Sequence, residues 1–340
     1  MRNETREAFD AWSQQVAKLN GVKTASQEFT VEPSVQQRLE SKIQESDAFL
    51  RMINVVGVDQ MKGDRLALGV AGPIAKRTDT SQSDREPSDV TELAEMRYEC
   101  VHTEFDSAIP WSKLDAWAKF PDFQRRVTDM VARQQGLDRL AIGFGGTHAA
   151  AATDSEAFPG LEDVNKGWLE LYRQHAPERV LFEGSKAPGE LRVGPGGDYK
   201  NLDALIFDAV NEMIAPWHRE SLEMKVIAGR SLLPAKYFQM ISEHGKTPSE
   251  MLALENSMFS NARFGRLQAV RTGPMPAGKI FITMPENLSL YWQRGSRRRY
   301  VVDNPRRNRI EDYQSSNDAY VVEDFGAGCL LENVVFGDWR

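Results

Sequence analysis

The stretch Gly143-Phe-Gly-Gly-Thr-His148 holds the residue types that come nearest to an enzyme active site. Backbone amides of its paired glycines could stabilise an oxyanion, and His148 could act as a base. The sequence, however, contains no Gly-x-Ser-x-Gly nucleophile elbow. Glycines in such a run also end helices, because they adopt positive φ without steric cost. We therefore interpret the run as a helix end and turn, with a hydrolase centred on His148 as the alternative.

Other candidate chemical motifs are weaker. The run Gly194-Pro-Gly-Gly-Asp-Tyr-Lys200 lacks the G-x-x-x-x-G-K-[ST] spacing of a phosphate-binding loop, and its proline removes an amide. The neighbouring carboxylates Glu311-Asp312 and Glu323-Asp324 lie on predicted strands, where adjacent side chains point to opposite faces. General acid–base catalysis needs opposed carboxylates across a cleft. We therefore expect no catalytic residues.

Arginines are concentrated in one part of the chain, between residues 294 and 309. They could contact nucleic-acid phosphates, or they could pair with carboxylates across a protein interface. A solvated surface is the third interpretation. We favour the interface, because the chain is rich in acidic partners and aromatic residues are sparse in this stretch. The predicted contact residues are Arg294, Arg297, Arg298, Arg299, Arg306, Arg307 and Arg309.

The composition excludes several classes of protein. The 340 residues carry a net charge of -7, which argues against dedicated nucleic-acid binding. A mean hydropathy of -0.48 and short apolar runs indicate no membrane helix. Met1–Asp10 is charged and lacks an apolar core, so we expect no secretory signal. Two cysteines and five scattered histidines predict neither a disulfide framework nor a metal or cofactor site.

The N-terminal third contains pieces that a monomer cannot easily bury. Phe9, Trp12, Val16 and Leu19 recur at helical spacing, and Asn20-Gly21 ends that helix. Pro33 favours an extended chain before it, and a second helix follows. Residues 55–105 have strand character at both ends and a polar middle. They predict a long two-stranded excursion that needs support from outside the chain.

The remainder predicts an α+β fold. Pro121 divides a helical region between residues 111 and 140, and a further helix follows near residues 161–175. Asp198 or Asn201 could cap a helix that begins at Leu202. Thr247-Pro-Ser-Glu250 is a typical helix start. Strands are expected at Lys225–Ala228, Lys279–Thr283, Leu288–Trp292, Arg299–Val302, Tyr320–Glu323 and Cys329–Val335.

Several stretches, taken together and in order, resemble the major capsid proteins of peduovirus-type temperate tailed phages. The resemblance covers nearly the whole chain. It implies an icosahedral shell subunit that encloses double-stranded DNA and is not an enzyme. The stretches are Leu19–Gly21, Phe29–Val35, Met61–Gly63, Tyr98–Cys100, Asp122–Gln124, Gly167–Leu169, Gly196–Tyr199, Leu202–Leu205, Glu286–Ser289, Tyr320–Asp324 and Ala327–Leu330.

The resemblance implies a tailed-phage capsid fold of the Hong Kong 97 type. Such a fold has an N-arm, an E-loop, a peripheral domain with a long spine helix, and an axial domain around which pentamers and hexamers form. The arginine cluster would lie where subunits meet. The implied divisions are an N-terminal segment at 1–29, the N-arm at 30–54, the E-loop at 55–105, the peripheral domain at 106–196 and 271–325, and the axial domain at 197–270 and 326–340.

The resemblance also implies processing and partners. A prohead protease is expected to remove the N-terminal segment beside Phe29-Thr30. The implied partners are further copies of the chain, a scaffolding or protease protein, a portal protein, and packaged DNA bound without sequence specificity. Assembly would occur in the bacterial cytoplasm, and the product is the virion. Gly143-Phe-Gly-Gly146 departs from the family's Phe-Asn-Gly.

Three hypotheses make different predictions. A shell subunit should lose shell formation, but not its fold, when charge is reversed at Arg298 and Arg299. A hydrolase requires a nucleophile within hydrogen-bond reach of His148. A nucleic-acid-binding module centred on residues 294–309 should show salt-dependent DNA affinity.

Overall fold

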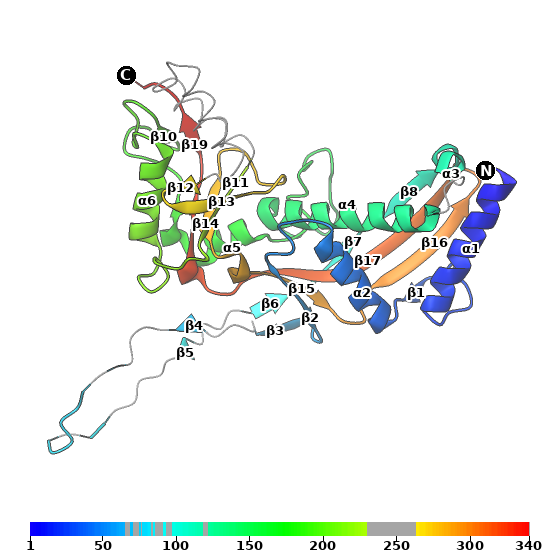
Figure 1. Cartoon of the computed structure of the whole chain (residues 1–340), viewed down its shortest axis with the longest axis horizontal. Coiled ribbons are helices and arrows are strands. Elements are labelled where there is room, and N and C mark those ends of the chain that lie inside the picture. Colours follow the sequence, from blue (N-terminus) through cyan, green and yellow to red (C-terminus); the bar gives the residue numbers. More distant parts are fainter. Residues whose placement is uncertain are drawn as a thin grey trace.

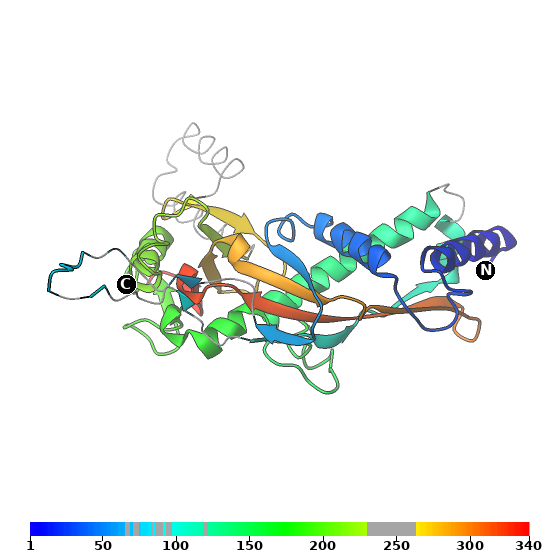
Figure 2. The same cartoon turned by 90° about the horizontal axis from the view of Figure 1, so that it is seen from below.

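The computed structural model describes residues 1–64, 69–70, 75, 77–82, 84–85, 91–92, 97–117, 122–229 and 263–339. The molecule is elongated, with its two termini at opposite ends in both views (Figures 1 and 2). One sheet and the long helix α4 run along the long axis. A second sheet and helix α6 lie near the C-terminus, and helix α1 lies at the far end (Figure 1). The combination of helices and largely antiparallel sheets confirms the α+β prediction.

Two of the described helices begin where the sequence provides a start signal. Pro33 stands at the first position of α2, where its missing amide costs nothing. The side chain of Asn201, and not that of Asp198, caps α6 by accepting from the amide of Ala204 at 2.9 Å. The α-helices are α1 (Asn3–Leu19), α2 (Pro33–Glu45), α3 (Trp111–Trp117), α4 (Phe123–Gly145), α5 (Trp168–His175) and α6 (Leu202–Met213).

The first sheet has the order β1-β16-β17-β15-β2, and β17 also pairs with β7 and β8. Its pairs are antiparallel except for β15 with β2. Strand β17 begins well before the predicted Tyr320. Its first half was not predicted because it carries polar residues, which the structure buries with hydrogen-bond partners. The bounds are β1 (Phe29–Thr30), β2 (Asn54–Val58), β7 (Val101–Glu104), β8 (Ser107–Pro110), β15 (Leu288–Gln293), β16 (Arg298–Asn304) and β17 (Arg309–Val322).

The second sheet has the order β12-β13-β11-β14-β18-β9, and the parallel pair β10-β19 lies in the same lobe. Its core includes Leu205, Ile206, Val226, Ile280 and Leu331. The strands are β9 (Val180–Leu181), β10 (Leu191–Val193), β11 (Lys225–Ala228), β12 (Arg263–Phe264), β13 (Leu267–Arg271), β14 (Ile280–Thr283), β18 (Gly328–Leu331) and β19 (Val334–Phe336).

This pairing groups the strands differently from the expected domain boundaries. We predicted that 106–196 and 271–325 form one domain, and 197–270 and 326–340 the other. Strand β14, however, lies between β11 and β18, while β9 pairs with β18 and β10 with β19. Residues 180–193 and 280–283 therefore belong with the second sheet. The chain passes from β14 in the second sheet to β15 in the first through the short 3-10 turn Pro285–Asn287. The amino-acid composition does not change at this turn, so the sequence gives no sign of a boundary there.

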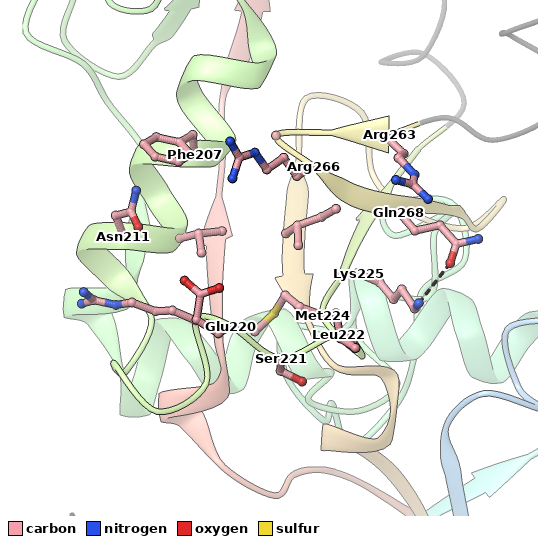
Figure 3. A pocket seen from close by; sticks show the side chains of 14 residues that line it. Phe207, Asn211, Glu220, Ser221, Leu222, Met224, Lys225, Arg263, Arg266 and Gln268 are labelled. Carbon is pink, nitrogen blue, oxygen red and sulfur yellow. Dashed lines mark hydrogen bonds between the residues drawn. The ribbon is translucent and has the colours of Figure 1, made fainter.

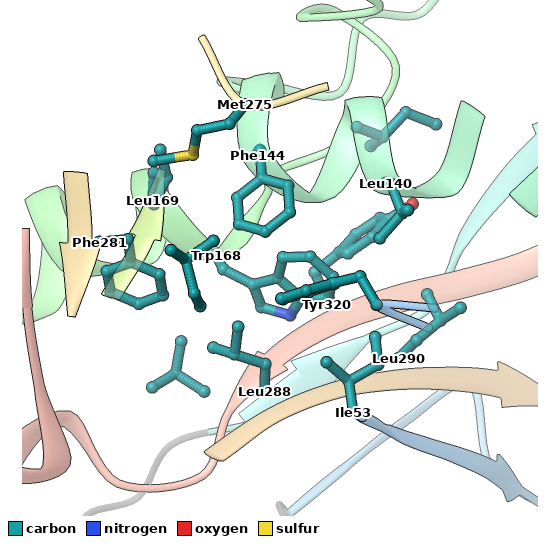
Figure 4. Close-up of a cluster of buried hydrophobic side chains, with 14 of the residues drawn as sticks. Ile53, Leu140, Phe144, Trp168, Leu169, Met275, Phe281, Leu288, Leu290 and Tyr320 are labelled. Atoms are coloured by element: carbon teal, nitrogen blue, oxygen red, sulfur yellow. The ribbon is translucent and has the colours of Figure 1, made fainter. Parts of the chain in front are cut away.

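The main core lies between helices α4 and α5 and the two sheets (Figure 4). Trp168 is fully buried at its centre, in edge contact with Phe144 and Tyr320. Its indole N–H donates to the Ser289 carbonyl at 3.0 Å, so the ring's polar atom is satisfied. The predicted helix near residues 161–175 forms only from Trp168, since Leu161 has a φ of 63°.

Helix α1 forms as its periodicity predicts. Phe9, Trp12 and Val16 are buried against the far end of the first sheet, in a cluster that includes Val301 and Ile310. Leu19, the last residue of the predicted stripe, is exposed instead. The N-terminal helix thus has its own apolar contact surface on the rest of the chain.

A narrow two-stranded excursion leaves the first sheet between β2 and β7 (Figure 1). Strand β3 (Lys62–Asp64) pairs antiparallel with β6 (Arg97–Glu99), and β4 (Gly69–Val70) pairs with β5 (Thr91–Glu92). In Figure 1 the described residues between 75 and 85 lie at the outer end of this ribbon, away from the two sheets. The predicted excursion is therefore confirmed. Its outer ends at residues 55–58 and 101–104 belong to the first sheet instead.

The glycines near residue 145 serve a different purpose from the predicted one. Helix α4 continues through Gly143 to Gly145, and neither these residues nor Gly146 has a positive φ. They are needed for close packing: a Cβ on Gly143 would lie 2.3 Å from the Trp168 ring, and one on Gly146 2.2 Å from the Asn165 carbonyl. The helix start predicted at Thr247–Glu250 lies outside the described residues.

Substituting Gly143→Ala should destabilise the chain by roughly 1–3 kcal/mol, because the added methyl group overlaps the rigid Trp168 ring. Urea unfolding of the unassembled chain measures the change. Gly273→Ala is the matched control, since its Cβ would meet no atom within 4 Å. Equal stability of the two variants would show that the helix tolerates the larger residue.

Candidate assembly surfaces

Helix α4 carries a buried arginine where it crosses helix α2 and strand β17. The Arg139 side chain is 1% exposed. Its Nε donates to Asp318 Oδ2 at 3.0 Å, its Nη2 donates to Asp318 Oδ1 at 3.2 Å, and its Nη1 donates to Glu40. Two-pronged contacts of this kind fix both distance and orientation. One guanidinium group therefore joins α2, α4 and β17.

A second buried arginine extends the network. Arg297, also 1% exposed, donates to Glu40 Oε1 at 3.0 Å, Gln135 Oε1 at 2.6 Å and Gln314 Oε1 at 2.9 Å. The amide of Gln135 donates to Gln314 Oε1 at 3.1 Å. Both Nη atoms of Arg297 thus donate inside the chain, so its surroundings give no support to the predicted contact with a neighbouring subunit. We call this set the ionic centre: Glu40, Gln135, Arg139, Arg297, Gln314 and Asp318.

The ionic centre balances two cations with two carboxylates. Burial alone would raise the pKa of Glu40, but the facing charges of Arg139 and Arg297 lower it below its usual value. Burial raises the pKa of Asp318, and its ion pair with Arg139 opposes that effect. Burial lowers the pKa of the Arg297 guanidinium, and Arg139 lowers it further, while Glu40 opposes them. Each charge is tolerated only because its partners are present.

Two more of the predicted contact arginines are engaged within the chain. Arg299 donates to both carboxylate oxygens of Asp312, at 3.0 and 2.7 Å, and its guanidinium lies 5.2 Å from the Trp12 ring centre. Arg309 donates to Glu311 Oε1 at 2.7 Å. The paired acids Glu311 and Asp312 therefore serve separate ion pairs, which agrees with their assignment as structural residues.

The remaining four arginines lie on the surface. Arg294 pairs with Asp59 and Arg298 with Glu28, each at 3.2 Å between exposed side chains. Arg306 and Arg307 occupy the exposed turn between β16 and β17, where no carboxylate of the described residues pairs with either. Such exposed groups contribute little within the monomer and stay available to a neighbouring molecule.

The predicted processing site lies in a paired strand. Phe29 is opposite Arg299 and Thr30 is opposite Arg298 in the antiparallel pair of β1 and β16. Phe29 is buried and Thr30 exposed. The preceding residues Ser26–Glu28 are exposed, so the linker before β1 is open to solvent.

The hydrolase alternative finds little support around His148. Its nearest hydroxyl is Thr147 Oγ1, 2.9 Å from Nδ1, but that hydroxyl also donates to the Glu162 carbonyl at 2.9 Å. A hydroxyl whose proton is committed to a carbonyl accepts from the imidazole instead of yielding a proton to it. The imidazole packs edge-on against Phe158. Gly145 and Gly146 are within or directly after a helix, so they form no oxyanion nest.

Cysteine and metal chemistry also find no site in the described part of the chain. Cys100 and Cys329 are free and buried, and burial raises the pKa of each thiol to about 12. The described residues include no cluster of histidine, cysteine or carboxylate side chains that could hold a metal ion. No described helix is both long and apolar enough to cross a bilayer.

Sequence reasoning missed the charged residues of the ionic centre other than Arg297. Glu40 shares one face of α2 with Gln36 and Ile43, and that face is buried. Asp318 falls in the part of β17 before Tyr320, where no strand was predicted. A charge inside an otherwise buried helical face is a usable signal, because such a group needs a partner. The local sequence pattern does not show which residue is the partner of the buried charge.

The chain is similar to phage capsid proteins over its whole length. A model of the P2 family of phage major capsid proteins matches residues 8–334. The capsid protein of Escherichia phage P2 is 44% identical over 347 residues, covering 100% of this chain and 97% of the relative. The major capsid protein of Serratia phage KSP20 is 36% identical over 341 residues, covering 99% and 98%.

A solved structure shares the fold. A chain of the satellite phage P4 procapsid, which includes a size-determination protein, aligns with a TM-score of 0.80 and 41% identity, covering 100% of both chains. This likeness confirms the expected tailed-phage capsid fold.

Substituting Glu40→Gln should lower the free energy of unfolding by about 3–5 kcal/mol, because two buried guanidinium groups would share one remaining carboxylate. Urea unfolding of the unassembled chain provides the measurement. Glu45→Gln, an exposed change on the same helix, should stay within about 0.5 kcal/mol of the unchanged chain. A small effect at Glu40 would mean that water replaces the carboxylate.

Proposed function

The chain belongs to the P2 family of phage major capsid proteins, and from this membership we propose how its parts build a shell. Members of the family are structural proteins and not enzymes. The chain is a subunit of the icosahedral capsid and is part of the virion. The observation that carries this conclusion is a family match that spans residues 8–334.

Subunits are joined by parts that extend beyond the monomer's own core. The excursion between β2 and β7 serves as the E-loop and lies over a neighbouring subunit. Its support is the pair of narrow ribbons β3-β6 and β4-β5, which lead outward from the first sheet (Figure 1). An isolated ribbon of this kind is marginal in water, so a neighbour's surface stabilises it. Residues 30–54, which include α2, serve as the N-arm.

The two sheets correspond to the two domains of the shell subunit. The first sheet with the spine helix α4 forms the peripheral domain. The second sheet with α6 forms the axial domain, to which residues 180–193 and 280–283 also belong. Pentamers and hexamers assemble around this lobe. Many modest contacts repeated by symmetry then hold each subunit strongly in the shell.

The exposed arginines contribute to contacts between subunits. Arg306 and Arg307 are the foremost candidates, because the β16–β17 turn presents them at the molecule's edge, unpaired with carboxylates of the described residues. Arg294 and Arg298, in exposed ion pairs, can exchange their partners for a neighbour's carboxylates. Arg299 and Arg309 act mainly within the subunit. This internal neutralisation also weakens the alternative of a nucleic-acid-binding module.

The N-terminal segment is removed during maturation, beside Phe29-Thr30. The exposed linker at residues 26–28 supports access by a protease, whereas β1 is hydrogen-bonded to β16. Cleavage at this bond therefore requires β1 to leave the sheet edge. The partners in this process are a scaffolding or protease protein, a portal protein, and double-stranded DNA bound without sequence specificity. Assembly takes place in the host cytoplasm.

Co-expression with the scaffold and protease genes of the same phage tests this function. Negative-stain electron microscopy should show closed icosahedral particles, and mass spectrometry should show subunits that begin near Thr30. Particles that retain Met1 would contradict the processing proposal alone. A monodisperse monomer at every concentration would contradict the assembly role of this chain.

Reversing charge at the turn, in Arg306→Glu with Arg307→Glu, should abolish closed particles while the unassembled chain keeps its unfolding midpoint, because both side chains are exposed. The matched control is Arg306→Lys with Arg307→Lys, which retains the charge and should still form particles. Electron microscopy and urea unfolding provide the two readouts. Normal particles from the glutamate variant would exclude this turn from the subunit contacts.

A further inference from the structure

A groove in the second lobe exposes apolar side chains to solvent (Figure 3). It lies between α6, the loop that follows it, and the turn between β12 and β13, and has a volume of about 410 Å³. Leu222 on its margin is 91% exposed, and Phe207 on α6 is 56% exposed. Leu267 and Met224 also contribute to the lining. Large apolar side chains that are exposed beside a groove are one mark of an interaction site.

The same groove carries a positive charge, although the whole chain has a net charge of -7. Arg219, Lys225, Arg263 and Arg266 line it, with Glu220 as the acidic member of the lining. Arg219 Nε donates to the Ile214 carbonyl at 2.7 Å, and Lys225 Nζ donates to Gln268 Oε1 at 3.0 Å. These two cations are thus held in place by neutral oxygen atoms, and no carboxylate in the described part of the chain forms an ion pair with either.

The two walls of the groove are tied together. The amide of Gly265 donates to Asp203 Oδ1 on α6 at 2.8 Å, and a Cβ on Gly265 would lie 3.0 Å from Ile206. Gly265 and Arg266 both have positive φ, 52° and 74°, as a tight turn between two strands requires. In Figure 3 the Arg266 side chain points across the groove toward Phe207 and Asn211. The groove is therefore preformed, with a cation at its rim.

We propose that this groove binds an acidic, amphipathic peptide segment of a partner protein. Large apolar side chains of the segment would enter between Phe207 and Leu222, and its carboxylates would pair with Arg266 and Arg219. Helical segments that dock in grooves use this combination of apolar anchors and flanking charges. The groove lies in the lobe with α6, apart from the excursion between β2 and β7 and from the turn between β16 and β17.

The lining favours a peptide from another protein over the two other occupants. Duplex DNA is too wide for a groove of this volume, and phosphates gain nothing from an apolar floor. A permanent contact between copies would have a more apolar and less charged centre, since such interfaces resemble a divided core. A cationic rim around a small apolar floor fits a contact that forms and then releases.

The test uses the full-length chain as unassembled subunits. The probe is a fluorescein-labelled model helix of about 18 residues with glutamate on one face and leucine on the other, read by fluorescence anisotropy. Arg266→Glu and Phe207→Ser should each weaken binding by at least about tenfold. Arg271→Glu, an exposed change on β13 outside the groove, should bind as the unchanged chain does. A lysine version of the helix should bind worst.

Three outcomes would overturn the proposal. They are equal binding by all variants, binding of a thymidine oligonucleotide that the same substitutions abolish, and loss of self-association in those variants without any binding of the acidic helix. The oligonucleotide result would assign the groove to nucleic acid, and the self-association result would assign it to a copy contact. If Arg266→Glu still forms closed shells, the capsid function stands whichever of these results is obtained.

Discussion

Two arginines buried between helix α2, helix α4 and strand β17 set the constraint on which the arrangement of this subunit depends. An unpaired ion inside a protein costs several kcal/mol. Arg139 and Arg297 are therefore tolerated only when Glu40 and Asp318 arrive together. Helix α2 can dock in one position, since only there does Glu40 meet both guanidinium groups. The same requirement explains why β17 buries polar residues such as Gln314.

The subunit is elongated because its apolar residues form separate clusters and not one central core. Separate apolar clusters lie beneath α1, around Trp168 and in the lobe with α6, one after another along the long axis of the molecule (Figure 1). The ribbon between β2 and β7 contributes little to any of them. A monomer of this form leaves surface that only neighbours can cover. Repetition by symmetry makes many such modest contacts effective together.

The arginines show how one residue type serves opposite purposes within a few positions. Arg298 is exposed, whereas Arg299 turns inward to Asp312, as alternation along a strand requires. Arg297 precedes the strand and enters the core. Arg306 and Arg307 stand in the turn, where the chain has no second layer to bury them. The local density of arginines therefore identified an important stretch. It did not distinguish the arginines that pair within the subunit from those that are exposed.

The sequence by itself determined which segments are helix or strand where periodicity is strong, as in α1 and α4, and it determined the absence of a convincing catalytic motif. Its ordered similarities determined the family and the fold. Only the tertiary structure decided that β14 joins β11 and β18, that Glu40 meets two arginines, and that Gly143 makes room for Trp168. Periodicity specifies which face of an element is buried. The partner on that face comes from residues far away in the chain, and it is specified only when the elements pack.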